Sequence, residues 1–190
     1  PPSPVMTALR DGARQHGFRF LIVGDTKSPK EFRLDGAEFL DVAAQEASGL
    51  AFARACPTRH YARKNIGYLL AIRDGAKLIV ETDDDNFPRP AFFAARTRRQ
   101  RAAVVTAHGW ANVYRYFSDA LIWPRGLPLD HVNGPLAAFE TLGTQEVECP
   151  IQQGLADANP DVDAIYRLLL PLPQDFRGGR TIALAPGAWC

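Results

Sequence analysis

Short apolar runs alternate along the chain with longer segments of helical composition. Residues 18–26 (FRFLIVGDT) predict a buried strand that ends at Gly24 and Asp25, and residues 37–42 (AEFLDV) predict a second short strand. The segment that follows, residues 42–56, is rich in Ala, Gln, Glu and Arg, which favour a helix. This order of elements is typical of the opening of an α/β domain.

A second helix and two further strands are predicted next. Residues 58–77 (TRHYARKNIGYLLAIRDGAK) place apolar side chains near one face, and Gly75 is suited to end the helix. Residues 77–82 (KLIVET) and 102–107 (AAVVTA) are apolar, β-branched runs typical of central strands. Alternation of strands and helices on this scale predicts an α/β fold, in which a mainly parallel central sheet is flanked by helices.

The pattern weakens in the second half of the chain, where aromatic residues, Pro and Gly are frequent. Only one further helix is predicted, near residues 160–170 (PDVDAIYRLLL), because Asp161 or Asp163 can cap its first turn. A length of 190 residues fits one domain with its own core. We therefore expect a single domain over residues 1–190, with a Pro-rich lead at residues 1–16.

Charge and composition exclude several classes of partner. The net charge of +1 creates no field for nucleic acid, and the four arginines of residues 96–101 (RTRRQR) are interpreted as a solvated helix end. No apolar stretch is long enough for a membrane span. The three cysteines are few, odd in number and without metal-ligand spacing, which indicates reduced thiols and a cytoplasmic location.

Three consecutive aspartates, Asp83 to Asp85, directly follow the predicted strand at residues 77–82. Because side chains alternate along extended backbone, Asp83 and Asp85 point the same way and Asp84 points away from them. Two carboxylates this close repel in a water-poor cleft unless a cation neutralises them, and Mg²⁺ or Mn²⁺ prefers such oxygen ligands. In open α/β sheets, ligands bind outside the carboxyl ends of the strands, which is where these aspartates are expected. The alternative is a solvated acidic turn that caps a helix near residues 87–95.

An Asp-x-Asp motif after a hydrophobic strand has two familiar chemical uses. One is phosphoryl transfer through an aspartyl nucleophile, but such a nucleophile usually follows the first strand, which here ends in VGDT. The other is glycosyl transfer, in which a metal ion bridges the aspartates and the diphosphate of a nucleotide sugar. The order of elements favours glycosyl transfer.

Four segments resemble the STELLO-like glycosyltransferase family and, more distantly, the reversibly glycosylated polypeptides, which are UDP-arabinopyranose mutases. In family order they are residues 21–29 (LIVGDTKSP), 61–86 (YARKNIGYLLAIRDGAKLIVETDDDN), 123–129 (WPRGLPL) and 150–168 (PIQQGLADANPDVDAIYRL). The resemblance implies a GT-A fold and a metal-dependent glycosyltransferase. Its partners would be a nucleoside-diphosphate sugar donor, a UDP-sugar, and an unknown acceptor.

The resemblance also implies roles for residues on the nucleotide side of the site. Asp83 and Asp85 would hold Mn²⁺ or Mg²⁺, with Asp84 toward the ribose or sugar. The residues implied near the base, ribose or phosphates are Gly24, Asp25, Lys27, Arg63 and Lys64. From composition alone, Asp25 can equally cap a turn, and Arg63 with Lys64 can form a solvated helix face.

On the sugar side, the resemblance implies catalytic roles for Arg125, Asp161 and Asp163. A rigid Trp-Pro entry and a Gly exit can aim the Arg125 guanidinium at a phosphate, and a surface-loop arginine is the alternative. Asp161 and Asp163 can equally be helix-start carboxylates. Two other functions stay open: a nucleotide-sugar mutase, and a non-catalytic scaffold or sugar-nucleotide sensor.

The three tryptophans, Trp110, Trp123 and Trp189, are expected in the core, with sugar stacking as the alternative. His108 follows a predicted strand, where it could meet a ligand. The chain stops on GAWC, inside a motif that continues in relatives, which implies a truncation at the C-terminus. The absence of an anchor before the domain favours a cytoplasmic relative or an excised domain.

Overall fold

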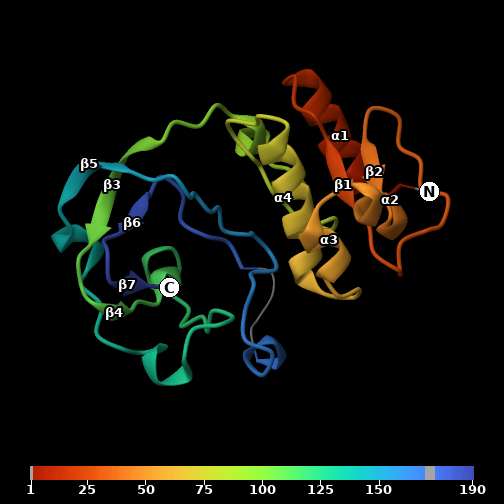
Figure 1. Ribbon diagram of the computed structural model, residues 1–190. Coiled ribbons are helices and arrows are strands. Elements are labelled where there is room, and N and C mark those ends of the chain that lie inside the picture. Colours follow the sequence, from red (N-terminus) through yellow and green to blue (C-terminus); the bar gives the residue numbers. More distant parts are fainter. Residues whose placement is uncertain (1, 170–173) are drawn as a thin grey trace. The chain divides into compact units, whose positions relative to one another are not determined.

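The computed structural model describes residues 2–169 and 174–190. It separates into two compact units, Pro1–Ala95 and Arg96–Cys190 (Figure 1). The division reflects contacts within each half of the chain and does not test the expected single GT-A-like domain, which stays a prediction.

The N-terminal unit begins with helix α1 (Pro4–Gln15), which lies inside the Pro-rich lead and was not predicted. The Ser3 hydroxyl accepts a hydrogen bond from the Met6 N–H at 3.2 Å, and Pro4 occupies the first turn, where it loses no helical hydrogen bond. Three apolar residues on one helix face are buried: Val5, Leu9 and Ala13. The Ser-Pro pair is therefore a helix start rather than part of an irregular lead.

Two short strands form the sheet of this unit, as the sequence predicts. Strand β1 (Leu21–Val23) pairs in parallel with β2 (Glu38–Leu40), with Ile22 opposite Phe39. Parallel pairing brings the carboxyl ends of both strands to one edge. The loops that leave this edge carry the first candidate residues.

The predicted helical segments are also confirmed. The first divides at Gly49, whose φ is +84°, into α2 (Val42–Ala47) and α3 (Ala51–Ala55). The second contains a 3-10 turn (Tyr61–Arg63) and then α4 (Lys64–Arg73), after which Gly75 adopts a φ of +84°. The core that joins these helices to the strands contains Ala53, Cys56, Ile66 and Leu70, with Leu21 and Leu40 packed against it.

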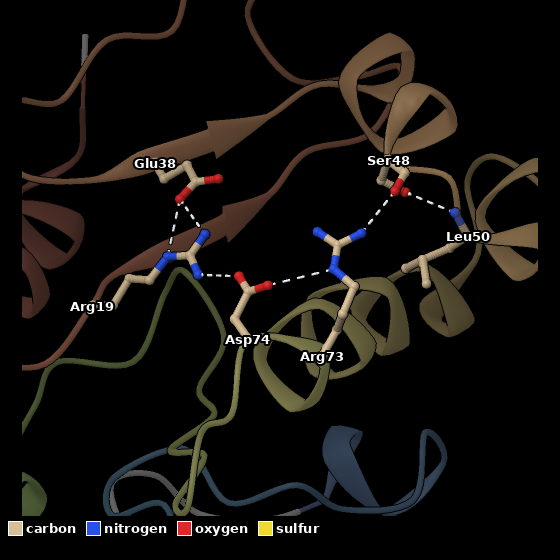
Figure 2. Close-up of polar contacts among 6 residues, drawn as sticks. All are labelled: Arg19, Glu38, Ser48, Leu50, Arg73 and Asp74. Atoms are coloured by element: carbon tan, nitrogen blue, oxygen red, sulfur yellow. Dashed lines mark hydrogen bonds and ion pairs between the residues drawn. The ribbon is translucent and has the colours of Figure 1, made fainter.

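Polar side chains tie the opposite edge of the sheet to the helices (Figure 2). Arg19, just before β1, donates to Glu38 of β2 at 2.6 Å and pairs with Asp74 at the end of α4. The hydrogen bond from Arg19 lowers the pKa of Asp74. Arg73 donates to the Ser48 carbonyl, in the turn between α2 and α3, at 2.8 Å. Exposed pairs of this kind contribute little singly but fix the direction of α4 together.

Two expectations for the segment after α4 are wrong. Residues 77–82 form no strand, and Leu78 and Ile79 are exposed rather than buried. In the part of the chain that the structure describes, β1 pairs only with β2, so this run has no neighbouring strand to support it. The aspartates do not cap a helix either, because the 3-10 turn Pro90–Phe93 has Arg89 at its N-cap, without a side-chain capping bond.

The C-terminal unit contains two small sheets. Strand β3 (Arg99–Val105) lies between the antiparallel β5 (Thr144–Glu148) and the parallel β6 (Ile182–Leu184). Strand β4 (Gly109–Trp110) pairs in parallel with β7 (Ala188–Trp189). The strand predicted at residues 102–107 is therefore confirmed, but Trp110 and Trp189 are exposed rather than in the core as expected.

The expectation that the arginine run at residues 96–101 is a solvated helix end is wrong. Arg99 and Arg101 belong to β3 and are exposed, whereas residues 102–105 of the same strand are buried. The run continues without a turn signal into the apolar segment, and the strand extends through both.

Irregular segments and 3-10 turns make up most of the rest of the C-terminal unit. The turns are Val113–Tyr116, Leu129–His131, Phe139–Thr141 and Tyr166–Leu168. The last of these is all that the described residues show of the helix expected at residues 160–170, whose final residue lies outside them. A buried cluster of Tyr114, Ile122 and Val162 holds this region together.

The α/β class and the parallel pairing of strands are confirmed. One continuous central sheet is not found among residues 2–169 and 174–190, where the strands form three small sheets. The GT-A fold therefore belongs to the proposal below. None of the helices in these residues is long and apolar enough to cross a membrane.

Candidate functional site

A groove of about 400 Å³ lies at the carboxyl ends of β1 and β2. Asp25, Ser28 and Lys30 line it from the loop after β1, and Asp41 lines it from the start of α2. Gly24, at the end of β1, is buried and donates its N–H to the Leu40 carbonyl at 2.9 Å. A Cβ at position 24 would lie 2.6 Å from the Phe39 ring, so the close packing of the two strand ends requires glycine.

Backbone donors hold the carboxylate of Asp25 in place beside this groove. Its Oδ1 accepts from the Thr26 N–H at 2.6 Å, and its Oδ2 accepts from the Arg59 N–H at 2.7 Å. Burial acts to raise the pKa of Asp25, but these hydrogen bonds and the nearby Arg63 charge outweigh it and lower the pKa. The expected turn-capping role is confirmed, and the same carboxylate joins the loop after β1 to the loop before α4.

A buried polar network supports the two strand ends. Gln45 of α2 donates to the carbonyls of Gly24 and Leu40, each at 2.7 Å. Its Oε1 accepts two bonds from the Arg63 guanidinium, at 2.6 and 3.0 Å, and Arg63 also donates to the Cys56 carbonyl at 2.9 Å. Arg63 is only 3% exposed, so the expectation of a solvated face is wrong for this residue.

Lys64 lies next to Arg63 in sequence but extends to the aspartate segment. Its ammonium pairs with Glu81 at 2.7 Å and with Asp83 at 3.4 Å, and it lies 5.7 Å from the centre of the Tyr61 ring. Desolvation acts to lower the pKa of Lys64, but the hydrogen bond and charge of Glu81 outweigh it and raise the pKa. The structure therefore places Lys64, which was predicted near the phosphates, in an ion pair with Asp83, which was predicted to bind the metal.

The three aspartates form an exposed turn. Asp84 and Asp85 lie at its tip, and the Asn86 N–H approaches the Asp83 carbonyl at 3.5 Å. No group of three or more His, Cys, Asp or Glu side chains gathers as a metal site within the described ranges. The solvated acidic turn that the sequence analysis gave as the alternative is thus the local structure, and Lys27 is likewise exposed.

A second candidate cluster lies within the C-terminal unit, where two of the segments that carry the family resemblance meet. Pro124 and Val162 form an antiparallel bridge, beside which the Arg125 guanidinium pairs with Asp161 at 2.9 Å. Both paired side chains are exposed, by 61% and 62% respectively. The Arg125 N–H also donates to the Asp161 carbonyl at 3.3 Å. The bridge holds a cation and an anion together at the surface.

The same bridge is completed by a backbone bond and a ring pair. The Asp163 N–H donates to the Trp123 carbonyl at 2.8 Å, and the Trp123 ring stacks on Tyr166 with centroids 5.3 Å apart. The Asp163 carboxylate accepts from the Ile165 N–H at 2.8 Å. Asp163 thus has the capping role expected of a helix-start carboxylate, which leaves Asp161 as the more available of the two acids.

Sequence reasoning missed two side chains that organise the first cluster. Glu81 provides the shorter contact to Lys64, and its signal is an acid two residues before the aspartate triplet. Gln45 is fully buried and connects both strand ends to Arg63, but a single Gln in an Ala-rich helical segment carries no recognisable signal. The two clusters lie in different units, and each is a candidate site on its own evidence.

Comparison with known proteins confirms the resemblance: the chain is similar to proteins described as probable glycosyltransferases. Over 166 residues, or 79% of the chain, it is 32% identical to probable glycosyltransferase STELLO2 of Arabidopsis thaliana. Over 181 residues, or 83% of the chain, it is 29% identical to STELLO1 of the same plant. The chain spans about a fifth of the length of these curated relatives, 21% and 22%. No family model and no solved structure matches it.

Proposed function

We propose that this chain is the nucleotide-sugar-binding part of a metal-dependent glycosyltransferase of GT-A fold, which binds a UDP-sugar and transfers the sugar to an acceptor. The observation that carries the proposal is the similarity, over about four fifths of the chain, to two proteins described as probable glycosyltransferases. The groove at the carboxyl ends of two parallel strands supports it, because α/β proteins bind ligands at such edges.

The chemistry of the aspartate turn fits a divalent ion. Asp83 and Asp85 offer hard carboxylate oxygens, and the exposed turn leaves room for diphosphate oxygens and water in the remaining coordination positions. Mn²⁺ or Mg²⁺ held there would supply positive charge against the departing diphosphate. Asp84, at the tip of the same turn, is assigned to the ribose or sugar.

The chain's own residues would bind and orient the donor around this turn. The Asp25 carboxylate is fixed by backbone donors and has lone pairs left to accept from ribose hydroxyls. Lys64 would exchange part of its contact with Asp83 for a phosphate oxygen. Arg63 acts as a positioning residue, since its guanidinium holds Gln45 and hence the strand ends.

The Arg125 and Asp161 pair would act on the sugar side. An exposed guanidinium can form bidentate bonds to a phosphate, and its release from Asp161 would free a carboxylate to accept from a sugar or acceptor hydroxyl. Asp163 would orient this segment through its bond to Trp123.

Calorimetric titration of UDP with and without Mn²⁺ tests the proposal. We expect binding that depends on Mn²⁺ and falls by roughly a hundredfold when Asp83→Asn and Asp85→Asn are combined, because both metal ligands lose their charge. Asp35→Asn, at an exposed aspartate in the same unit, is the matched control and should bind like the wild type. Equal binding with and without the metal, or in the double variant, would disprove the metal-dependent site.

Product analysis then distinguishes the reaction. Incubation with UDP-sugars and chromatography should show UDP release that depends on an added acceptor. Ring isomerisation of a UDP-pentose would instead identify the mutase function. Intact binding of metal and UDP without turnover of any donor, together with a stable protein partner, would identify the scaffold or sensor.

A further inference from the structure

The segment between α4 and the aspartate turn carries an acid to which the proposed function gives no role. Glu81 lies in residues 77–82, which form no strand, two positions before Asp83. Its Oε1 accepts a hydrogen bond from the Lys64 ammonium at 2.7 Å. The same ammonium contacts Oδ1 of Asp83 at 3.4 Å. Glu81 and Asp83 therefore compete for one cation, and the shorter contact belongs to Glu81.

Two side chains of α4 hold the Glu81 carboxylate. Lys64 begins this helix and Tyr68 follows four residues later, so both lie on one face of it. Tyr68 donates a side-chain hydrogen bond to Glu81. Burial raises the pKa of Tyr68, and the charge of Glu81 and this hydrogen bond raise it further. Glu81 is thus fixed by two donors, whereas Asp83 shares one of them at a longer distance.

The three charged side chains are partly exposed, so each contact is weak and the ammonium can change partners. The exposed fractions of the Lys64, Glu81 and Asp83 side chains are 36%, 41% and 54%. An ion pair of this exposure shifts an equilibrium by about fivefold at most. Small differences therefore decide which partner the ammonium prefers, and without the Glu81 charge it keeps Asp83 as an anionic partner.

A neighbouring ammonium opposes the role that the proposed function gives to Asp83. The Lys64 ammonium contacts Oδ1 of this carboxylate and repels any other cation that approaches it. An aspartate paired with lysine must give up that contact before its oxygens can hold a divalent ion. Glu81 makes this exchange easier, because the ammonium that leaves Asp83 stays hydrogen-bonded to Glu81.

We propose that Glu81 is a positioning residue, which holds the Lys64 ammonium off Asp83 and so leaves the Asp83 carboxylate available to Mn²⁺ or Mg²⁺. Glu81 acts through Lys64 and touches neither the metal nor the donor. It also keeps the ammonium beside the aspartate turn, within reach of a phosphate oxygen of the donor. The metal-binding part of this inference rests on the proposed function, whereas the hold of Glu81 on Lys64 does not.

The competing assignment makes Glu81 a metal ligand itself, since its Oε1 and the Asp83 Oδ1 contact the same nitrogen. The hydrogen bonds argue against it. A metal ion on Glu81 would displace the bonds from both Lys64 and Tyr68, whereas one on Asp83 displaces the longer Lys64 contact. The two assignments predict different responses to the loss of Lys64, because that loss can restore a ligand blocked by the ammonium but cannot replace a missing one.

Titration of Mn²⁺ alone into the 190-residue chain, with free Mn²⁺ measured by electron paramagnetic resonance, tests the proposal. We expect Glu81→Gln to weaken Mn²⁺ binding about fivefold, because Lys64 then turns to Asp83. Lys64→Met should strengthen binding by less than about twofold in the otherwise wild-type chain, but by at least about fivefold when Glu81→Gln is present. The double variant therefore regains wild-type affinity. Glu46→Gln, at an exposed glutamate of the same unit, is the control and should bind Mn²⁺ like the wild type.

Two results of this titration would overturn the positioning role. Wild-type Mn²⁺ affinity in the Glu81→Gln variant would show that Glu81 does not affect Asp83. Weak binding that Lys64→Met fails to restore would make Glu81 either a metal ligand or a merely structural support of the turn, because neither of these is repaired by removing the ammonium.

A measurement without metal or UDP separates this inference from the proposed function. In denaturation at low salt, the coupling energy between Lys64→Met and Asp83→Asn should at least about double when Glu81→Gln is present, since the ammonium then pairs with Asp83 alone. An unchanged coupling energy would overturn the hold of Glu81 on Lys64. An increased coupling energy in a chain that binds no Mn²⁺ up to roughly 10 mM would support that hold and reject the proposed metal site.

Discussion

Arg63 and Arg125 are two arginines in the same expected role, beside the phosphates of a nucleotide sugar, but the structure uses them differently. Arg63 is 3% exposed, and its guanidinium donates to Gln45 and to the Cys56 carbonyl. Arg125 is 61% exposed and has one ion pair, with Asp161. A buried guanidinium cannot change partners without leaving buried N–H donors unbonded, whereas an exposed one can exchange a carboxylate for a phosphate.

This difference separates support from contact. Arg63 acts on the groove indirectly, because it holds Gln45, which in turn holds the ends of β1 and β2. Arg125 pairs with an exposed carboxylate and holds no buried group in place, so a change of its partner on ligand binding costs little stability. The same residue type in two family segments therefore predicts two different mutational signatures.

The largest expected effect is a loss of stability when the buried Gln45–Arg63 network is broken. Gln45→Ala should lower the free energy of unfolding by about 3 kcal/mol, because the Arg63 guanidinium and two strand-end carbonyls lose their partner together. Chemical denaturation followed by circular dichroism measures it. Gln153→Ala, at an exposed glutamine, is the control and should change stability by less than about 0.5 kcal/mol. A loss below about 1 kcal/mol for Gln45→Ala would show that the network is not a support.

A smaller effect, on binding alone, is expected at the exposed Arg125. Arg125→Ala should change the free energy of unfolding by less than about 0.5 kcal/mol but weaken UDP-sugar binding about tenfold, through loss of one charge-assisted contact. Calorimetry and denaturation of the same sample separate the two. Arg98→Ala removes another exposed ion pair of this unit, with Glu148, and should leave binding unchanged. If Arg125→Ala destabilised the fold instead, the contrast with Arg63 would fail.

The smallest effect is the pH dependence contributed by Asp25. Its folded-state pKa is lowered, so it stabilises the fold above the unfolded-state pKa of about 4, and that stabilisation is lost as pH falls through the folded-state value. Asp25→Asn should be less stable than the wild type near pH 6, and this difference should shrink as the solution is acidified below about pH 4. Denaturation series at several pH values measure it. A difference that is constant with pH would exclude the carboxylate charge as its source.

Local sequence signals predicted those parts of the fold that local chemistry decides. The break at Gly49 was not foreseen, but α4, its stop at Gly75 and strands β1 to β3 follow from apolar runs and turn residues. Residues 77–82 have the same composition as a strand and are not one, because pairing partners and cover decide a strand. The pairing of β4 with β7 has no local signal at all.

The candidate site divides in the same way. The turn at Asp25 could be foreseen because an aspartate after a glycine caps its own neighbours. The position of Lys64 between Glu81 and Asp83 could not, since it depends on how α4 directs the chain that follows it. The role of Gln45 could not be predicted, because its hydrogen-bond partners, the Gly24 carbonyl and Arg63, are distant from it in sequence. The metal, the donor and the acceptor stay predictions.

The strand order of the C-terminal unit has a consequence for synthesis on the ribosome. Ala103 of β3 pairs with Ile182, and Trp110 of β4 pairs with Trp189, so both strands depend on residues made much later. The parallel pair β1 and β2 is complete once residue 40 has emerged. Until residues 182–184 emerge, one edge of β3 has no partner strand, and its apolar residues 102–105 are not yet covered. An unpaired edge of this kind is where a nascent chain is most prone to pair with the wrong strand.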